Sequence, residues 1–310
     1  MSQNKVVFSL VGFKADSDQH TTTPTTMDWL KNKLREPKRR NFSLNFKQVN
    51  EITIPKKQGV FFDIHISVKF DCLIFSISDS LYIYGRNCKT LLQEIKLKHD
   101  TVVSQMDEED DALYLMVCDS ENYHCYKYKI SSLIKCDNTK HELLACLTWK
   151  SKRGFNNPYG VSVFQKYVLI LEFEMGLLAL DRETGLESNI ILPEVTTGSS
   201  IRMIQDKYLI TSTDETQLEF FEYCSKELEW KCIKSIVIPY RVFSIFYEDN
   251  SQYVYLSDNR HNEGGIIVMR LSDFEIFKEY KRTGLTSGLG VDYETGELYV
   301  CGSKTISVYQ

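Results

Sequence analysis

A strand–turn–strand unit that returns six times is the feature that most constrains how this chain can fold. Each unit joins two short runs of alternating aromatic and β-branched residues through a polar turn, which is typical of a β-hairpin. The units occupy residues 70–85, 111–129, 165–181, 206–223, 251–271 and 296–309. Their spacing is 40, 55, 41, 45 and 44 residues when they are aligned on Leu73, Leu113, Val168, Leu209, Val254 and Leu298. A four-stranded propeller blade needs about 40 to 50 residues, so the period predicts an all-β propeller.

Further apolar strands flank these hairpins and complete six blades. One precedes each hairpin and another follows each of the first five, and the longest spacing indicates an insertion around 136–150. The last hairpin has no strand after it, whereas residues 47–55 (KQVNEITIP) end like the outer strands SNIILP and IKSIVIP. We predict that this N-terminal strand is the outer strand of the sixth blade and closes the ring, which removes two open sheet edges. A seven-bladed ring that recruits Val6–Phe13 is the alternative.

The composition fits one propeller domain behind an N-terminal arm. Of the 310 residues 43% are hydrophobic, which is enough for a sizeable core, and no apolar run is long enough to predict a membrane span. We expect an arm at 1–42, with a short basic helix that ends at Pro37, and the six-bladed propeller at 43–310. The basic segment 31–40 (KNKLREPKRR) fits a solvated part of this arm. Its alternative role is nuclear import or a contact with nucleic acid or acidic lipid.

The cysteines indicate reduced thiols. There are nine, an odd number, and no two have C-x-x-C spacing. Several lie in strand-like runs, among them Cys72 and Cys301, where a thiol serves as a small apolar side chain. The N-terminus does not have the pattern of a secretory signal. We therefore expect a monomeric cytoplasmic protein without a bound metal or cofactor, with the nucleus as the alternative location.

Several segments resemble the repeats of NHL-type propellers. Residues 158–163 (PYGVSV) are similar to the P-x-G-V-x-V opening of such a blade, and 253–258 (YVYLSD) with 266–268 (IIV) are similar to its middle. Residues 290–292 (GVD) and 298–300 (LYV) repeat both pieces in the last blade. The resemblance covers the predicted propeller and is degenerate in its first two blades. It implies a β-propeller that acts as a protein-interaction disc or as an RNA-binding platform.

The loops on one face of such a ring hold the residues that we predict to bind a partner. This loop face combines the turns between second and third strands with the connections from each outer strand to the next inner strand. The candidate binding residues are Arg153, Asn157, Arg202, Arg241, Asp258, Arg260 and His261. Their mixed charge suits the recognition of a polar peptide. Acidic residues between the arginines weaken the positive field that RNA requires. The favoured function is therefore a non-enzymatic scaffold for a protein or peptide partner, and RNA binding is the alternative.

Metal-dependent catalysis, such as that of lactonase-type propellers, has few suitable residues in this chain. A calcium site needs six or more oxygen ligands. The starts of the inner strands offer Asp63, Asn157, Ser200, Arg241 and Ser287. Only one of these is a carboxylate. A zinc site needs converging histidines, and the available ones are His65, His99, His124 and His261. Because these histidines fall on inequivalent positions of the repeat, a lactonase or other hydrolase is the least favoured hypothesis.

Overall fold

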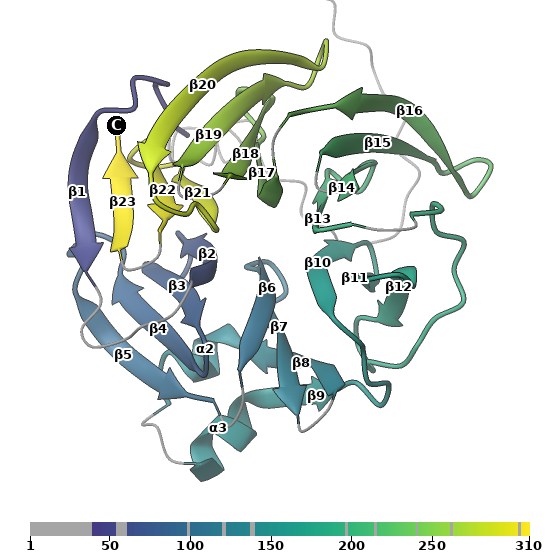
Figure 1. Cartoon of the computed structure of the whole chain (residues 1–310). Coiled ribbons are helices and arrows are strands. Elements are labelled where there is room, and N and C mark those ends of the chain that lie inside the picture. Colours follow the sequence, from purple (N-terminus) through teal and green to yellow (C-terminus); the bar gives the residue numbers. More distant parts are fainter. Residues whose placement is uncertain are drawn as a thin grey trace, which may run out of the picture. The chain divides into compact units, whose positions relative to one another are not determined.

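Figure 1 shows the computed structural model of the chain, in which the strands are arranged as blades around a common axis. The structure describes residues 39–53, 61–97, 100–119, 122–136, 140–195, 198–213, 216–239, 241–260, 263–302 and 305–310. Residue contacts divide the chain into Met1–Lys38 and a compact unit at Arg39–Gln310. The helix expected before Pro37 and the alternative strand at Val6–Phe13 lie outside the described residues.

The described strands form six antiparallel sheets, each ordered from the axis outward. Blade 1 comprises β2 (Phe61–Ser67), β3 (Cys72–Ile77), β4 (Ser80–Gly85) and β5 (Leu91–Lys96). Blade 2 comprises β6 (Thr101–Asp107), β7 (Ala112–Asp119), β8 (Asn122–Lys129) and β9 (Leu147–Lys150). Blade 3 comprises β10 (Pro158–Phe164), β11 (Tyr167–Glu172) and β12 (Gly176–Asp181). Blade 4 comprises β13 (Ser200–Ile204), β14 (Tyr208–Thr213), β15 (Gln217–Cys224) and β16 (Glu229–Val237). Blade 5 comprises β17 (Val242–Glu248), β18 (Tyr253–Arg260), β19 (Glu263–Arg270) and β20 (Glu275–Thr283). Blade 6 comprises β21 (Leu289–Asp292), β22 (Glu297–Cys301), β23 (Thr305–Tyr309) and the N-terminal β1 (Gln48–Thr53). The predicted six-bladed all-β propeller, closed by an N-terminal outer strand, is confirmed.

The second strand of a blade is among its most enclosed elements, which explains the apolar runs in the sequence. Every residue of β3 is buried, and β11 and β14 are buried except at their first residue. A second strand has bonded strands at both edges and packed blades against both faces, so it lacks the polar alternation of a sheet with one wet face. The outermost strands β16 and β20 are exposed at most positions.

Strand β1 closes the ring by pairing with β23. The two strands are antiparallel, from Gln48 opposite Tyr309 to Thr53 opposite Thr305. The Ile52 side chain is buried in an apolar cluster that joins blade 6 to blade 1. The segment before β1 is also anchored: Phe42 and Phe46 are buried beside blades 5 and 6, and the Phe42 amide donates to Glu248 Oε1 at 2.8 Å. The core of the propeller therefore extends back to Phe42.

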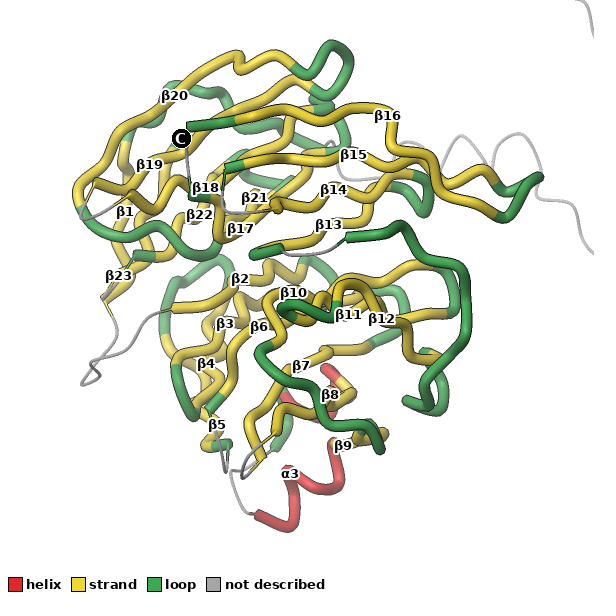
Figure 2. Tube along the Cα trace, turned by 45° about the vertical axis from the view of Figure 1, so that its right-hand side comes forward, coloured by secondary structure: helices red, strands yellow, loops and turns green. Residues whose placement is uncertain are grey.

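Blade 3 lacks the outer strand that the sequence motif SNIILP (188–193) predicts. Only a short stretch of backbone follows the edge of β12, where the Ser188 amide donates to the Ala179 carbonyl at 2.9 Å. Beyond it, Ile190 and Leu192 pack on the apolar cluster between blades 3 and 4, while Ile191 is exposed. Figure 2 shows this segment as a loop. Two of its three consecutive apolar residues therefore serve side-chain packing instead of strand pairing.

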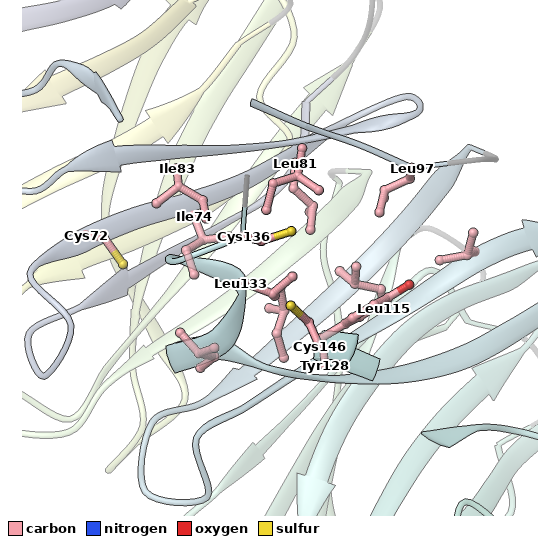
Figure 3. Close-up of a cluster of buried hydrophobic side chains, with 14 residues drawn as sticks. Cys72, Ile74, Leu81, Ile83, Leu97, Leu115, Tyr128, Leu133, Cys136 and Cys146 are labelled. Carbon is pink, nitrogen blue, oxygen red and sulfur yellow. The ribbon is translucent and has the colours of Figure 1, made fainter. Parts of the chain in front are cut away.

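The predicted insertion is present in blade 2 and is helical. Helix α2 (Ile130–Leu133) and helix α3 (Lys140–Cys146) separate β8 from β9. The sequence motif ELLACLTW predicts one strand here, but its first residues form α3 because Glu, Leu and Ala favour helix. Figure 3 shows Leu133, Cys136 and Cys146 of the insertion packed with side chains of blades 1 and 2. The insertion therefore fills the gap between these two blades.

Arg86 and Arg182 form ion pairs between neighbouring blades, and we call such a group of ion pairs a clasp. Arg86, after β4, donates to both carboxylate oxygens of Asp292 in blade 6 at 3.0 Å, and it also pairs with Asp71 and Glu294. The Asp292 side chain is fully buried and that of Arg86 is 6% exposed. Arg182, after β12, pairs with Asp107 and Asp110 of blade 2, and these side chains are more exposed than Arg86 and Asp292. Arginine–carboxylate ion pairs therefore join the first blade to the last and the third blade to the second.

Truncation tests the closure by β1. We expect the chain without residues 1–38 to melt cooperatively as a monomer, because Arg39–Gln310 forms a compact unit of its own. The chain without residues 1–53 loses β1 and exposes the edge of β23, so it should aggregate or melt over a broad range. Circular dichroism and light scattering measure both properties. Cooperative melting of the shorter chain as a monomer would show that closure does not need β1.

Substitution of Arg86 tests the clasp between blades 6 and 1. Arg86→Met leaves the buried Asp292 carboxylate without its partner, which should cost about 3–5 kcal/mol of unfolding free energy in urea titrations. Adding Asp292→Asn should recover part of the loss, since the charge is then removed. The control is Arg270→Met, because Arg270 is 41% exposed and pairs at the surface, where about 0–1 kcal/mol is expected. Equal losses for both single variants would contradict the clasp.

Candidate functional site

Five polar side chains from three inner strands form a cluster in the central channel. Inner strands β2, β6, β10, β13, β17 and β21 surround the axis in Figure 1. The channel cluster consists of Asp63 and His65 on β2, Ser104 and Gln105 on β6, and Arg202 on β13. Solvent reaches four of the five in part, and Ser104 is buried. Blade 3 lies between β6 and β13 along the chain, so the cluster joins blades that are not consecutive.

Hydrogen bonds link the channel cluster. Asp63 Oδ2 accepts from the Ser104 amide at 2.9 Å, and the Ser104 hydroxyl lies 2.8 Å from His65 Nε2. Arg202 Nη1 donates to Gln105 Oε1 at 2.9 Å. The Arg202 guanidinium also lies over the Phe246 ring, 5.8 Å from its centroid. Arg202 of blade 4 thus contacts blade 2 on one side and blade 5 on the other, which requires its side chain to extend into the channel.

Burial sets the charge of the channel cluster. Loss of water raises the pKa of Asp63 to about 7, although the Ser104 amide and the charge of Arg202 oppose the change. Loss of water also lowers the pKa of His65 to about 3, and Arg202 adds to that effect. The pKa of Arg202 is lowered by burial as well, but the guanidinium stays charged. Near neutral pH the channel therefore holds a cation, a neutral imidazole and a carboxyl group close to half-ionised.

A second feature is an exposed apolar patch on the loop face of blade 3. It consists of Tyr159 near the start of β10 with Phe173 and Met175 in the turn between β11 and β12. These side chains are 41%, 40% and 63% exposed. The Tyr159 and Phe173 rings meet edge to face with centroids 5.6 Å apart. We call these three residues the blade-3 patch.

An ion-pair group supports the backbone beside the blade-3 patch. The side chain of Glu172 is 4% exposed and lies 3.2 Å from Arg153 Nη2. Its other oxygen accepts from the Asn156 amide. Arg153 Nη1 also pairs with Glu187 at 3.0 Å. Two carboxylates therefore compensate the charge of Arg153 and hold the loop in place.

The structure places the predicted binding residues in different parts of the propeller and does not bring them together in one site. Arg153 lies in the ion-pair group just described, and the Asn157 carbonyl accepts from the Phe173 amide at 3.1 Å. Arg202 lies in the channel. Arg241 is exposed at the start of β17, over the Phe243 ring at 4.9 Å, and Asp258 is buried in β18 opposite Val242. The remaining two have no described side chain: Arg260 is placed by its backbone at the end of β18, and His261 lies outside the described residues.

The sequence-based choice of binding residues omitted most of the channel cluster. The sequence pattern offers Asp63 and His65 only as candidate metal ligands, and it does not single out Ser104 or Gln105. The sequence does contain a signal that could have identified these four residues. All of them are polar residues inside predicted inner strands, where apolar residues dominate. Among the described residues, no group of three or more histidine, cysteine or acidic side chains is arranged to hold a metal ion.

Comparisons with known proteins leave the chain without a family assignment. Neither models of protein families nor curated proteins match it. In the part of the chain that the structure describes, no helix is long and apolar enough to cross a membrane. The six-bladed architecture therefore stands on the sheet topology, and the function must be inferred from the channel cluster and the loop face.

The raised pKa of Asp63 gives a pH-dependent contribution to stability. The unfolded carboxyl ionises near pH 3.8, whereas the folded one keeps its proton up to about 7. The folded state therefore loses stability as the pH rises through this window. Asp63→Asn keeps an acceptor for the Ser104 amide and cannot ionise. We expect the Tm of this variant, relative to the native protein, to increase from acid to neutral pH in calorimetric scans. A constant difference would show that Asp63 is not shifted.

The lowered pKa of His65 acts in the opposite direction. The unfolded imidazole takes up a proton below about 6.5, but the folded one does so only near 3. Stability is therefore lost as the pH falls through this range. His65→Gln cannot be protonated there, so its Tm relative to the native protein should increase on acidification. The same calorimetric scans measure this trend, and a profile parallel to that of the native protein would contradict the burial of a neutral His65.

Proposed function

We propose that this protein is a non-enzymatic interaction scaffold of the NHL type that presents its loop face to a protein or peptide. The blade-3 patch is the observation that carries the proposal. Large apolar side chains scattered singly on a surface need no explanation, but Tyr159, Phe173 and Met175 are exposed together. Aromatic residues and methionine are enriched in protein interfaces. A partner that covers this patch removes its apolar surface from water, and this burial favours binding.

The charges near the patch support a protein partner over RNA. Glu172 and Glu187 compensate Arg153, so this part of the loop face lacks the net positive charge that attracts a phosphate backbone. Exposed Arg241 beside Phe243 adds a second place where a polar peptide can bind. Mixed charges of this kind give specificity to a protein interface. RNA binding remains the alternative function.

The serine–histidine contact in the channel lacks the features of a catalytic pair. Ser104 and His65 are within hydrogen-bond distance, as a nucleophile and its base would be. However, an imidazole whose pKa is about 3 is a poor base at neutral pH. Asp63 bonds to the Ser104 amide, and among the described residues no carboxylate bonds to His65 Nδ1. These observations support a non-enzymatic role over a hydrolase.

Peptide selection tests the interaction proposal. The immobilised protein is used to select from a displayed library of random peptides, and the affinity of the selected peptides is measured by fluorescence anisotropy. Phe173→Ser combined with Met175→Glu should weaken binding at least about tenfold, because the apolar anchor is lost. The control is Leu228→Glu, which changes a 62% exposed apolar residue in the turn between β15 and β16, outside the loop face. Both variants should melt close to the native Tm.

Three outcomes would change the proposed function or the place of the interface. Peptides that bind the patch variant and the control equally well place the interface elsewhere. Salt-sensitive retention of RNA, lost when Arg153 and Arg241 are both changed to Glu, favours the nucleic-acid alternative. Esterase activity towards p-nitrophenyl acetate that Ser104→Ala abolishes would instead favour the hydrolase hypothesis.

A further inference from the structure

Arg202 differs from Arg86 and Arg182, the two arginines that join blades through ion pairs, in how its guanidinium is bonded. Arg86 pairs with three carboxylates and Arg182 with two. Arg202 bonds only to the neutral amide of Gln105 and lies over the Phe246 ring. Within the described part of the chain, no carboxylate lies at ion-pair distance from it. Asp63 attracts the charge of Arg202 without forming an ion pair with it. A guanidinium enclosed by protein without a directly paired carboxylate is costly, so its place in the channel calls for an explanation.

The geometry leaves donors of Arg202 free for a ligand. A guanidinium carries five N–H groups, and one nitrogen is engaged with Gln105 Oε1. The Phe246 ring, whose centroid lies 5.8 Å from the guanidinium carbon, attracts the charge without accepting an ordinary hydrogen bond, so it leaves the remaining N–H groups available. Solvent reaches part of both Arg202 and Gln105, so a small group in the channel can reach the free edge. Gln105 fixes the direction in which the fork points.

The surrounding groups do not neutralise this cation at slightly acidic pH. On β2, His65 is neutral because its pKa is about 3, and Asp63 gains a proton as the pH falls through about 7. After β21, Tyr293 is neutral because burial raises its pKa to about 12, and on β22 burial raises the pKa of the Cys301 thiol. Arg202 therefore gives the channel a positive charge. The net positive charge of the cluster is larger when Asp63 is protonated, because its negative charge is then absent.

We propose that the central channel binds a carboxylate group at Arg202, with Gln105 orienting the guanidinium. The planar fork of arginine matches the two oxygens of a carboxylate. One guanidinium balances a single negative charge, whereas a phosphate dianion would leave an excess of negative charge beside Asp63. The carboxylate belongs either to a small organic acid or to an acidic side chain of a peptide. The site lies in the channel and uses no residue of the blade-3 patch, so it does not rest on the proposed interaction at that patch.

Calorimetric titration with sodium acetate tests the site directly. At about pH 6 we expect saturable binding with a Kd on the order of 1 mM, and weaker binding at about pH 8, where Asp63 is ionised. Sodium chloride at equal ionic strength should give no such binding. Arg202→Gln should abolish binding and Arg202→Lys should weaken it, because lysine lacks the fork. Arg270→Gln, at an exposed ion pair on β19, is the matched control and should bind like the native protein.

A variant that keeps Arg202 separates loss of the site from loss of folding. Asp63→Asn should bind acetate equally at both pH values, because the titrating neighbour is gone. An acidic hexapeptide, compared with its amidated neutral counterpart, distinguishes the two sources. Tighter binding of the hexapeptide identifies a peptide side chain, and binding of acetate alone identifies a small acid. The proposal fails if neither binds, if Arg202→Gln binds as well as the native protein, or if inorganic phosphate binds more tightly than acetate.

Discussion

The pairing of β1 with β23 is the interaction on which the rest of the ring depends. A blade buries its faces only against neighbouring blades, so an open ring would expose two faces and the edge of β23. The closing strand also brings Ile52 into the apolar cluster shared by blades 1 and 6. Arg86 reinforces the same junction through the buried Asp292. Segments from opposite ends of the chain thus hold blade 6 against blade 1. At the other places where adjacent blades meet, the two blades follow one another in sequence.

Closure also creates the channel and its chemistry. Arg202 and Gln105 are 97 residues apart, yet they bond because both inner strands face the same axis. Enclosure removes water from Asp63 and His65 and moves their pKa values in opposite directions. The channel cluster therefore combines a charged guanidinium with groups that prefer to be neutral. The loop face differs in character, since its arginine at position 153 is compensated and its most prominent feature is apolar.

Much of the fold was predictable from the sequence, but the site was less so. The apolar pattern predicts six inner strands and six outer strands, the N-terminal strand included, and two of the outer strands differ in the structure. SNIILP has the pattern of an outer strand but packs through Ile190 and Leu192 without extending the sheet. ELLACLTW divides between α3 and β9. In both cases some apolar residues pack on a core cluster while Ile191 and Leu144 are exposed, and the pattern could not report which backbone groups pair.

The sequence by itself determined the number of blades and the strand that closes the ring. The repeat and the strand-like motif at 47–55 are local patterns that can be read from the order of the residues alone. Tertiary structure decided which polar residues meet. Whether Arg202 has a counter-charge, or Asp63 keeps its proton, depends on distances between different blades and on how much water the channel admits. Those quantities exist only once the ring has closed. The same holds for Tyr159 and Phe173, whose contact requires β10 and β11 to lie side by side.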